Sequence, residues 1–212
     1  MTIQEWVDVM SGITSSVTAI CTLIPAIIAA LVVVYGVNSW RRETVGKRRL
    51  DAGEAIMSKF YQTRDAIREI RDPWSSPAES SERERSDNES ETVRRALDIS
   101  FVVNKRLQSK EALFTEFRSL KYMAMSVFGP DAEQPFKEIE SVIREIKNAA
   151  FWLQADPWLP EIYQSEPDRR ENLKQQRELR SVIWSRYSDN DKIEQRVQDA
   201  VNQMESMAKI FP

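Results

Sequence analysis

The stretch that most constrains this chain runs from Val9 to Trp40 and contains no Asp, Glu, Lys or Arg. Within it, residues 13–37 are long enough to cross a membrane, because about 20 helical residues at 1.5 Å each span a hydrocarbon core of roughly 30 Å. A buried helix of a soluble domain rarely continues this far without a charge on any face. A secretory signal peptide would begin with basic residues, whereas the only charged side chains before this stretch are the acids Glu5 and Asp8. The sequence therefore predicts one N-terminal transmembrane helix over residues 13–37.

Aromatic and basic residues flank this predicted span. Amphipathic rings favour the boundary between hydrocarbon and water, and clustered positive charge stays on the cytoplasmic side. We therefore expect a single-pass protein of the inner (plasma) membrane, with its N-terminus outside and its C-terminal domain in the cytoplasm. The residues predicted to lie at the membrane interface are Trp6, Tyr35, Trp40, Arg41, Arg42, Lys47, Arg48 and Arg49. Residues 1–12 are predicted to form a short external N-terminus or an interfacial helix, because their apolar residues recur at helical spacing.

The rest of the chain predicts helices only, because no window alternates as a strand would. Residues 38–71 are predicted to form a juxtamembrane basic segment and a stalk helix, which ends before Pro73 because the residue preceding a proline disfavours the α conformation. Residues 72–90 predict a mobile loop, since two prolines stand among Ser, Glu and Arg. Residues 91–212 are predicted to form a bundle that packs with residues 50–71. The expected fold class is all-α, with one N-terminal transmembrane helix followed by an antiparallel bundle of three to four long helices.

The clearest periodic pattern of the bundle follows Gly129 and Pro130, which are expected to end the preceding helix. Asp131 is predicted to cap the next helix, whose apolar residues recur at alternating spacings of three and four and predict a stripe that packs against antiparallel neighbours. These residues are Phe136, Ile139, Ile143, Ile146, Ala150 and Leu153. A break is predicted at residues 108–109, where serine would cap a new start. Residues 169–211 predict one long helix or two that join near residues 188–191.

Composition excludes several kinds of catalytic site. Histidine is absent and Cys21 is the only cysteine, which removes Ser-His and Cys-His catalysis, His-ligated zinc and intramolecular disulfides. The carboxylates near the apolar stripe lie off it, where water solvates them, whereas a metal site in a bundle needs ligands that point inward. They are Glu133, Glu138, Glu140 and Glu145. We therefore expect no enzyme, no cofactor, no metal and no small-molecule substrate.

Charge points to lipid rather than to nucleic acid. The formal net charge is −3, and the basic cluster of residues 41–49 lies where anionic head groups would meet it. A lipid bilayer is the first expected partner, and no nucleic-acid partner is expected.

A densely polar segment at the end of the predicted stalk offers a candidate surface for a protein partner. Aromatic and arginine residues are favoured as interface anchors, and here three aromatic residues stand beside a polar run that contains three arginines. The residues predicted for this surface are Phe60, Tyr61, Arg64, Asp65, Arg68, Arg71 and Trp74. The alternative interpretation is a charged helix face with ion pairs three to four residues apart, each of which contributes only tenths of a kcal/mol.

Three segments carry a resemblance to known proteins: KRRLDAGEAIMSKFYQTRDAIREIRDPW, FRSLKYMAMSVFGPDAEQPF and KNAAFWL. They resemble an uncharacterised group of bacterial single-span membrane proteins, and the similarity covers most of the chain. The resemblance implies an inner-membrane protein with a helical cytoplasmic domain. It brings no reaction, cofactor or partner with it.

Three hypotheses of function follow from the sequence. The first is a membrane-tethered interaction or scaffold protein, which holds a protein partner or a second copy of itself near the bilayer. The second is an oligomeric membrane-perturbing effector or pore component of the toxin or phage-defence type. It meets the difficulty that no Asp, Glu, Lys or Arg lies within the span to line an ion path. The third is a hydrolase that uses carboxylates in place of histidine, for which no motif is present.

Overall fold

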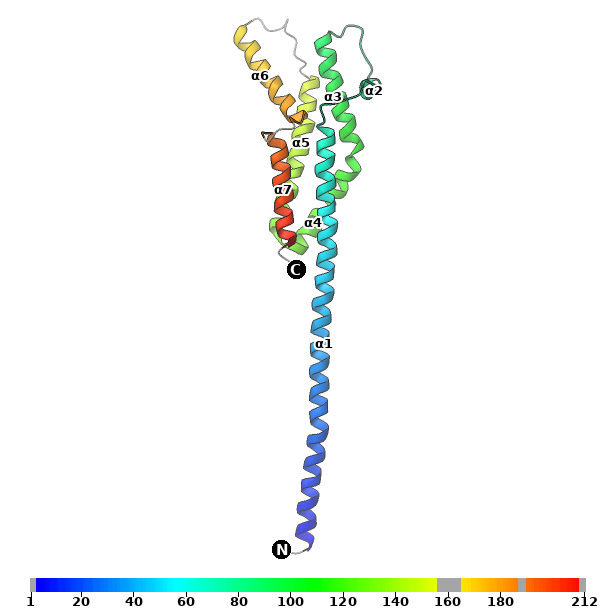
Figure 1. Cartoon of the computed structure of the whole chain (residues 1–212), viewed down its shortest axis with the longest axis vertical. Helices are drawn as coiled ribbons and strands as arrows, with labels where there is room; N and C mark the ends of the chain where they lie inside the picture. The colour runs from blue at the N-terminus through cyan, green and yellow to red at the C-terminus, as the bar shows by residue number, and fades with distance from the viewer. Residues whose placement is uncertain (1–2, 156–164, 187–189, 210–212) are drawn as a thin grey trace. The chain divides into compact units, whose positions relative to one another are not determined.

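The computed structural model describes residues 3–155, 165–186 and 190–209, and these ranges are helical with no strand (Figure 1). The all-α prediction is confirmed for them. Helix α1 covers Ile3–Ile70, and the chain divides into two compact units, Met1–Arg49 and Leu50–Pro212. The sequence predicts a stalk helix that reaches Arg71, and α1 ends at Ile70. The bounds of the other elements are α2 Pro77–Ser80, α3 Glu91–Ser109, α4 Glu111–Phe128, the 3-10 turn η1 Pro130–Ala132, α5 Glu133–Ala155, α6 Glu166–Ile183 and α7 Lys192–Lys209.

The first unit is a stretch of α1 whose described apolar side chains are exposed. Val32 and Val33 are 64% and 63% exposed, and Ile28, Leu31 and Val37 are also open to their surroundings. The side chains of residues 11–27 lie outside the described ones, so most of the span predicted over residues 13–37 falls there. Among the residues that are described, no helix is both long enough and apolar enough to cross a membrane.

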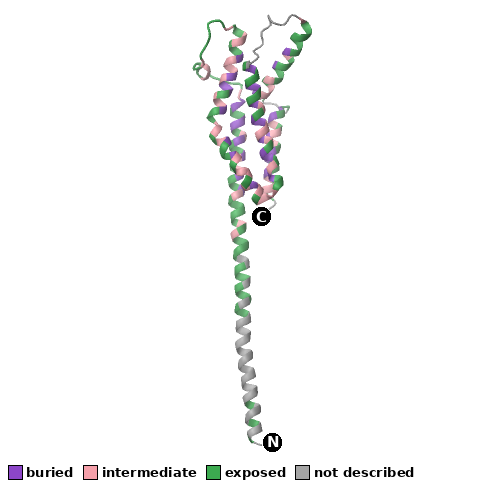
Figure 2. Ribbon diagram, turned by 180° about the vertical axis from the view of Figure 1, so that it is seen from behind, coloured by how far each residue is buried: buried purple, intermediate pink, exposed green. Residues whose placement is uncertain are grey.

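In the second unit, the last part of α1 packs antiparallel to α4. Contacts at three levels set this register: the Lys59 ammonium pairs with Glu116, the Lys110 ammonium lies 2.6 Å from Glu69, and Gly53 faces the ring of Phe128. Helix α7 also runs antiparallel to α1, and α5 runs antiparallel to both α4 and α7. Together, residues 50–70, α4, α5 and α7 form a four-helix arrangement around one core (Figure 2).

Helices α3 and α6 extend this arrangement beyond the end of α1. Helix α5 is long enough to contact both sets of helices. It packs against α4 and α7 near its start and against α3 and α6 near its end. The contact between α3 and the end of α5 includes a hydrogen bond, in which the hydroxyl of Ser100 donates to the carbonyl of Ala150 at 2.8 Å. The two junctions α3/α4 and α6/α7 thus lie at the level where α1 ends.

These junctions show where the helices predicted from the sequence are divided. The break predicted at residues 108–109 is confirmed, but Lys110 rather than Ser109 stands at the start of α4. The hydroxyl of Ser109 donates backward to the carbonyl of Arg106 at 2.7 Å. The C-terminal segment is two helices, and α6 begins at Glu166, earlier than predicted, because Ser165 caps it. Helix α4 ends as predicted at Gly129, whose φ of 98° favours glycine, and η1 occupies the position of the predicted Asp131 cap.

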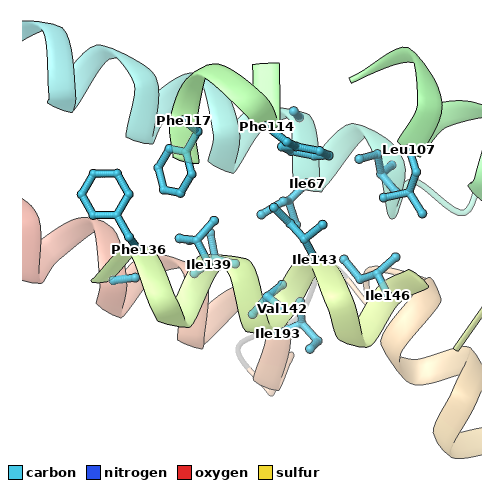
Figure 3. Packing of buried hydrophobic residues seen from close by; sticks show 14 of the residues in the cluster. Ile67, Leu107, Phe114, Phe117, Phe136, Ile139, Val142, Ile143, Ile146 and Ile193 are labelled. Atoms are coloured by element: carbon cyan, nitrogen blue, oxygen red, sulfur yellow. The ribbon is translucent and has the colours of Figure 1, made fainter. Parts of the chain in front are cut away.

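Three aromatic rings from three helices meet in the core, and two of them, Phe117 and Phe136, are labelled in Figure 3. The ring centroid of Phe60 in α1 lies 4.9 Å from that of Phe117 in α4 and 4.8 Å from that of Phe136 in α5, both edge-on. All three side chains are fully buried. Edge-to-face pairs add about 0.5–1.5 kcal/mol beyond the burial of area, so this trio fixes how α1, α4 and α5 meet. The apolar stripe predicted from Phe136 to Leu153 is confirmed as buried.

Candidate functional site

The most enclosed charged group of the described residues is an ion pair at the end of α1. The side chains of Arg71 and Asp191 are 1% and 3% exposed, and the Arg71 Nη2 atom lies 3.0 Å from both carboxylate oxygens. The same guanidinium donates to the carbonyls of Val182 at 2.8 Å and of Ser181 and Trp184 at 3.1 Å. These carbonyls form the C-terminal end of α6, which carries partial negative charge.

Asp191 also holds the first turn of α7. Its carboxylate accepts from the amides of Ile193 and Glu194 at 3.1 Å and from the amide of Arg186 at 3.0 Å. Burial by itself would raise the pKa of Asp191, but the amide hydrogen bonds and the hydrogen bond from Arg71 outweigh burial and lower the pKa below its ordinary value. One carboxylate therefore joins the end of α1, the end of α6 and the start of α7.

A second arginine, Arg106, binds the segment that follows α1. Arg106 of α3 donates to the carbonyls of Asp72 at 2.7 Å and Trp74 at 2.8 Å, and it forms a bidentate pair with Glu79 at 3.0 and 2.8 Å. The hydrogen bond from Arg106 lowers the pKa of Glu79. Within the predicted loop of residues 72–90, α2 is therefore a short helix bound to α3, and the amide of Ser76 donates to Glu79 across it at 3.1 Å.

The remainder of this loop is bound by Arg83. Its guanidinium donates to Asp98 of α3 at 2.6 Å and to both oxygens of Glu89 at 2.8 and 2.6 Å. The hydrogen bond from Arg83 lowers the pKa of Glu89 to about 2. The contact of Arg83 with Asp98 and the contact of Glu79 with Arg106 thus tie this segment of loop-like composition to α3 at two points.

The residues predicted as a partner surface do not form one surface. Phe60 and Arg71 are fully buried, in the aromatic core and in the ion pair, because the helix turns both toward the bundle. Tyr61 donates to Glu205 at 2.7 Å, and the Arg68 Nε atom donates to Glu194 at 2.7 Å, so both contact α7 of the same chain. Arg64 lies over the Tyr61 ring and pairs with Asp65 at 3.0 Å. Trp74, by contrast, is 81% exposed.

Other exposed aromatic residues of the bundle were not singled out from the sequence. Phe151 and Trp152 at the end of α5 are 59% and 53% exposed, and their ring centroids lie 5.6 Å apart. Tyr122 of α4 is 70% exposed and lies beneath the Lys121 ammonium. The sequence contained a sign of this exposure, because residues 151 and 152 lie between the stripe positions Ala150 and Leu153 and therefore off the buried face.

The residues predicted for the membrane interface are all exposed in the described helix. Trp6, Tyr35 and Trp40 are 56%, 77% and 65% exposed, and the basic residues of the cluster are open as well. The carboxylates near the stripe are paired with cations: Glu138 and Glu145 each lie 2.6 Å from Arg196, Glu133 pairs with Lys137, and Glu140 pairs with Lys121. Within the described ranges, no group of three or more residues has the composition of a metal site.

The hollows of the bundle include two that are lined by described residues. One, of about 240 Å³, has Phe114, Phe117 and Ile143 at its floor and cations of α4 and α5 at its rim. The other, of about 400 Å³, lies between α5, α6 and α7 and is lined by Ser181 and Arg196 among others. The Ser181 hydroxyl donates to the carbonyl of Glu178 at 2.7 Å, so it is not oriented on a base. Neither lining combines a nucleophile with a base that would activate it.

The resulting arrangement is a closed bundle fastened by buried charge, with exposed apolar and aromatic residues outside it. The strongest polar groups among the described residues are engaged in contacts between segments of this chain. No family model, no curated protein and no solved structure matches this chain.

Proposed function

We propose that this chain is a membrane-tethered helical interaction protein. In it, residues 13–37 anchor the chain in the inner membrane, and the bundle of residues 50–212 holds a protein partner or a second copy at the cytoplasmic face. The observation that carries this proposal is the exposed apolar surface of α1 between Ile28 and Val37, which no other part of the chain covers among the described residues. Large uncovered apolar surfaces mark contact with a membrane or another protein.

The uncharged stretch favours the membrane as the cover for this surface. A helix that binds a protein along one side keeps polar residues on the other, whereas residues 9–40 carry no charge on any side. Cations follow at once, with Arg41 and Arg42 next to Trp40, as expected for the cytoplasmic end of a span.

Replacing Ile28 with Arg is expected to move the full-length chain from the membrane pellet to the supernatant or to degradation. A charge deep in the hydrocarbon opposes insertion by about 2.5–3.5 kcal/mol on insertion scales. The matched control is Val45→Arg, which adds the same side chain to an equally exposed position of the same helix, beyond the predicted span. The measurement is carbonate extraction of cell membranes followed by immunodetection, together with protease treatment of spheroplasts to test that the bundle is protected inside.

The two variants must differ for the proposal to stand. Equal recovery of Ile28→Arg and Val45→Arg in the pellet would show that membrane insertion of this stretch is not what retains the chain. A collapse of membrane potential on induced expression of the unmodified chain would instead support the membrane-perturbing alternative.

The binding half of the proposal is supported by the exposed pair Phe151 and Trp152. Paired aromatic side chains present a large rigid area and are favoured at the centres of interfaces. A photoreactive residue in place of Trp152, in cells at native expression, is expected to give a discrete crosslinked band. The same residue in place of Arg170, whose side chain is 78% exposed on α6, is the control. A band of identical mobility and yield from both positions, or none from position 152, would contradict a partner at this site.

A further inference from the structure

The basic residues that follow Trp40 lie on one side of α1 rather than around it. The arginine face consists of Arg41, Arg42, Val45, Arg48 and Arg49. Successive residues of an α-helix are about 100° apart, so positions i, i+1, i+4, i+7 and i+8 share an arc of roughly 120°. Val45 stands at the middle of this arc and is 52% exposed.

The opposite side of the same helix turns has a different character. Glu43 is the only acidic residue between Val9 and Arg49, and it stands four positions before Lys47, roughly opposite Val45. The arginine face therefore contains no acid. The rule that sets orientation in a membrane counts the cations near the end of a span and is indifferent to the side of the helix that carries them. Their one-sided arrangement calls for a ligand on that side.

The arginines of this face are available to such a ligand. All four side chains are exposed, and Arg41, Arg42 and Arg48 have no acidic partner among the described residues. Four guanidinium groups along about 12 Å of helix axis repel one another unless anions lie between them. The face thus concentrates positive charge, and at Arg41, Arg42 and Arg48 no described acid neutralises it.

The direction of the side chains identifies where the anion comes from. Side chains of an α-helix lean toward its N-terminus, which here is the side of Trp40 and the uncharged stretch. Arginine also extends its apolar stem along a hydrocarbon surface and places its guanidinium in the polar layer beyond. With residues 13–37 in the membrane, Arg41 and Arg42 reach the layer of phosphate groups directly, and a tilt of the helix toward the arginine face brings Arg48 and Arg49 to the same layer. A guanidinium fits phosphate with two parallel hydrogen bonds.

We propose that the arginine face is a binding site for the phosphate groups of anionic phospholipids, which it prefers over zwitterionic lipids. The inference rests on the proposed membrane span and deepens it by naming the lipid class that surrounds one side of the anchor. Adjacent residues provide the test, since Arg48 lies on the face and Lys47 lies away from it at the same depth. Both substitutions to Gln remove one positive charge.

The experiment uses the full-length chain in mild detergent with equimolar phosphatidylglycerol and phosphatidylcholine, and native mass spectrometry counts the lipids that remain bound. The unmodified chain is expected to retain phosphatidylglycerol several-fold over phosphatidylcholine. Arg48→Gln is expected to lower this ratio about fivefold, as expected for one cation near an anionic surface, whereas Lys47→Gln is expected to change it less than about twofold.

Two results would overturn the inference. Equal losses in Arg48→Gln and Lys47→Gln would mean that charge count alone attracts the lipid, and a ratio near one for the unmodified chain would mean that no preference exists. Failure of the proposed span is a separate result, because it is read from recovery of the unmodified chain in the membrane pellet and not from the lipid ratio.

Discussion

Asp191→Asn is expected to lower the free energy of unfolding of the bundle by about 3–5 kcal/mol, because it leaves the buried Arg71 charged and without its counter-ion. Asparagine keeps an oxygen for the amides of Ile193 and Glu194, so the start of α7 remains capped. The loss therefore reports the ion pair rather than the cap. Chemical unfolding of the purified full-length chain in detergent, followed by circular dichroism, measures it.

The control is Arg68→Gln, which breaks a pair between the same two helices at the surface. The side chains of Arg68 and Glu194 are 47% and 27% exposed, and we expect a loss of less than about 1 kcal/mol. Acid provides a second check on Asp191. Its pKa is lowered in the folded chain, so its stabilising effect is complete above the unfolded pKa of about 4 and is lost as pH falls through the folded pKa. A gap between the unmodified chain and Asp191→Asn that stayed constant down through this range would contradict the assignment.

Phe136→Ala is expected to lower the free energy of unfolding by about 3–5 kcal/mol, because it removes one buried ring of the aromatic trio and leaves a cavity in its place. For a chain of this size the midpoint of thermal unfolding should fall by roughly 10 °C. The control is Phe151→Ala, which makes the same substitution on the same helix at a side chain that is 59% exposed. Differential scanning fluorimetry in detergent compares the two, and a similar shift in both variants would show that the trio is not the centre of the core.

Local patterns in the sequence predict most of the helices of the second unit. The stripe from Phe136 to Leu153 and the stop at Gly129 are properties of neighbouring residues, so periodicity and turn chemistry are enough to find them. The short α2 was also readable, since Ser76 and Glu79 stand at the spacing of a capping box. It was missed because the composition around it favours a loop.

Long-range pairing explains what the sequence does not reveal. Arg71 stands in a run of charged residues, and its partner lies 120 positions later, so nothing near it indicates that it is buried. Phe60 was assigned to a surface for the same reason, although its ring meets residues of α4 and α5. Helix α6 shows the same difficulty, because the polar residues Asn172 and Gln176 are buried there while Leu173 and Leu179 are only partly buried.

The separation between Arg71 and Asp191 has a consequence for how the chain is made. At roughly 5–20 residues per second, Asp191 leaves the ribosome about 6–24 s after Arg71. During that interval the end of α1 lacks both the carbonyls of α6 and the first turn of α7. The uncharged stretch of residues 9–40, by contrast, is complete long before. Closure of the bundle at Arg71 therefore waits for residue 191, and a chain that terminates before this residue is released with Arg71 lacking its carboxylate partner.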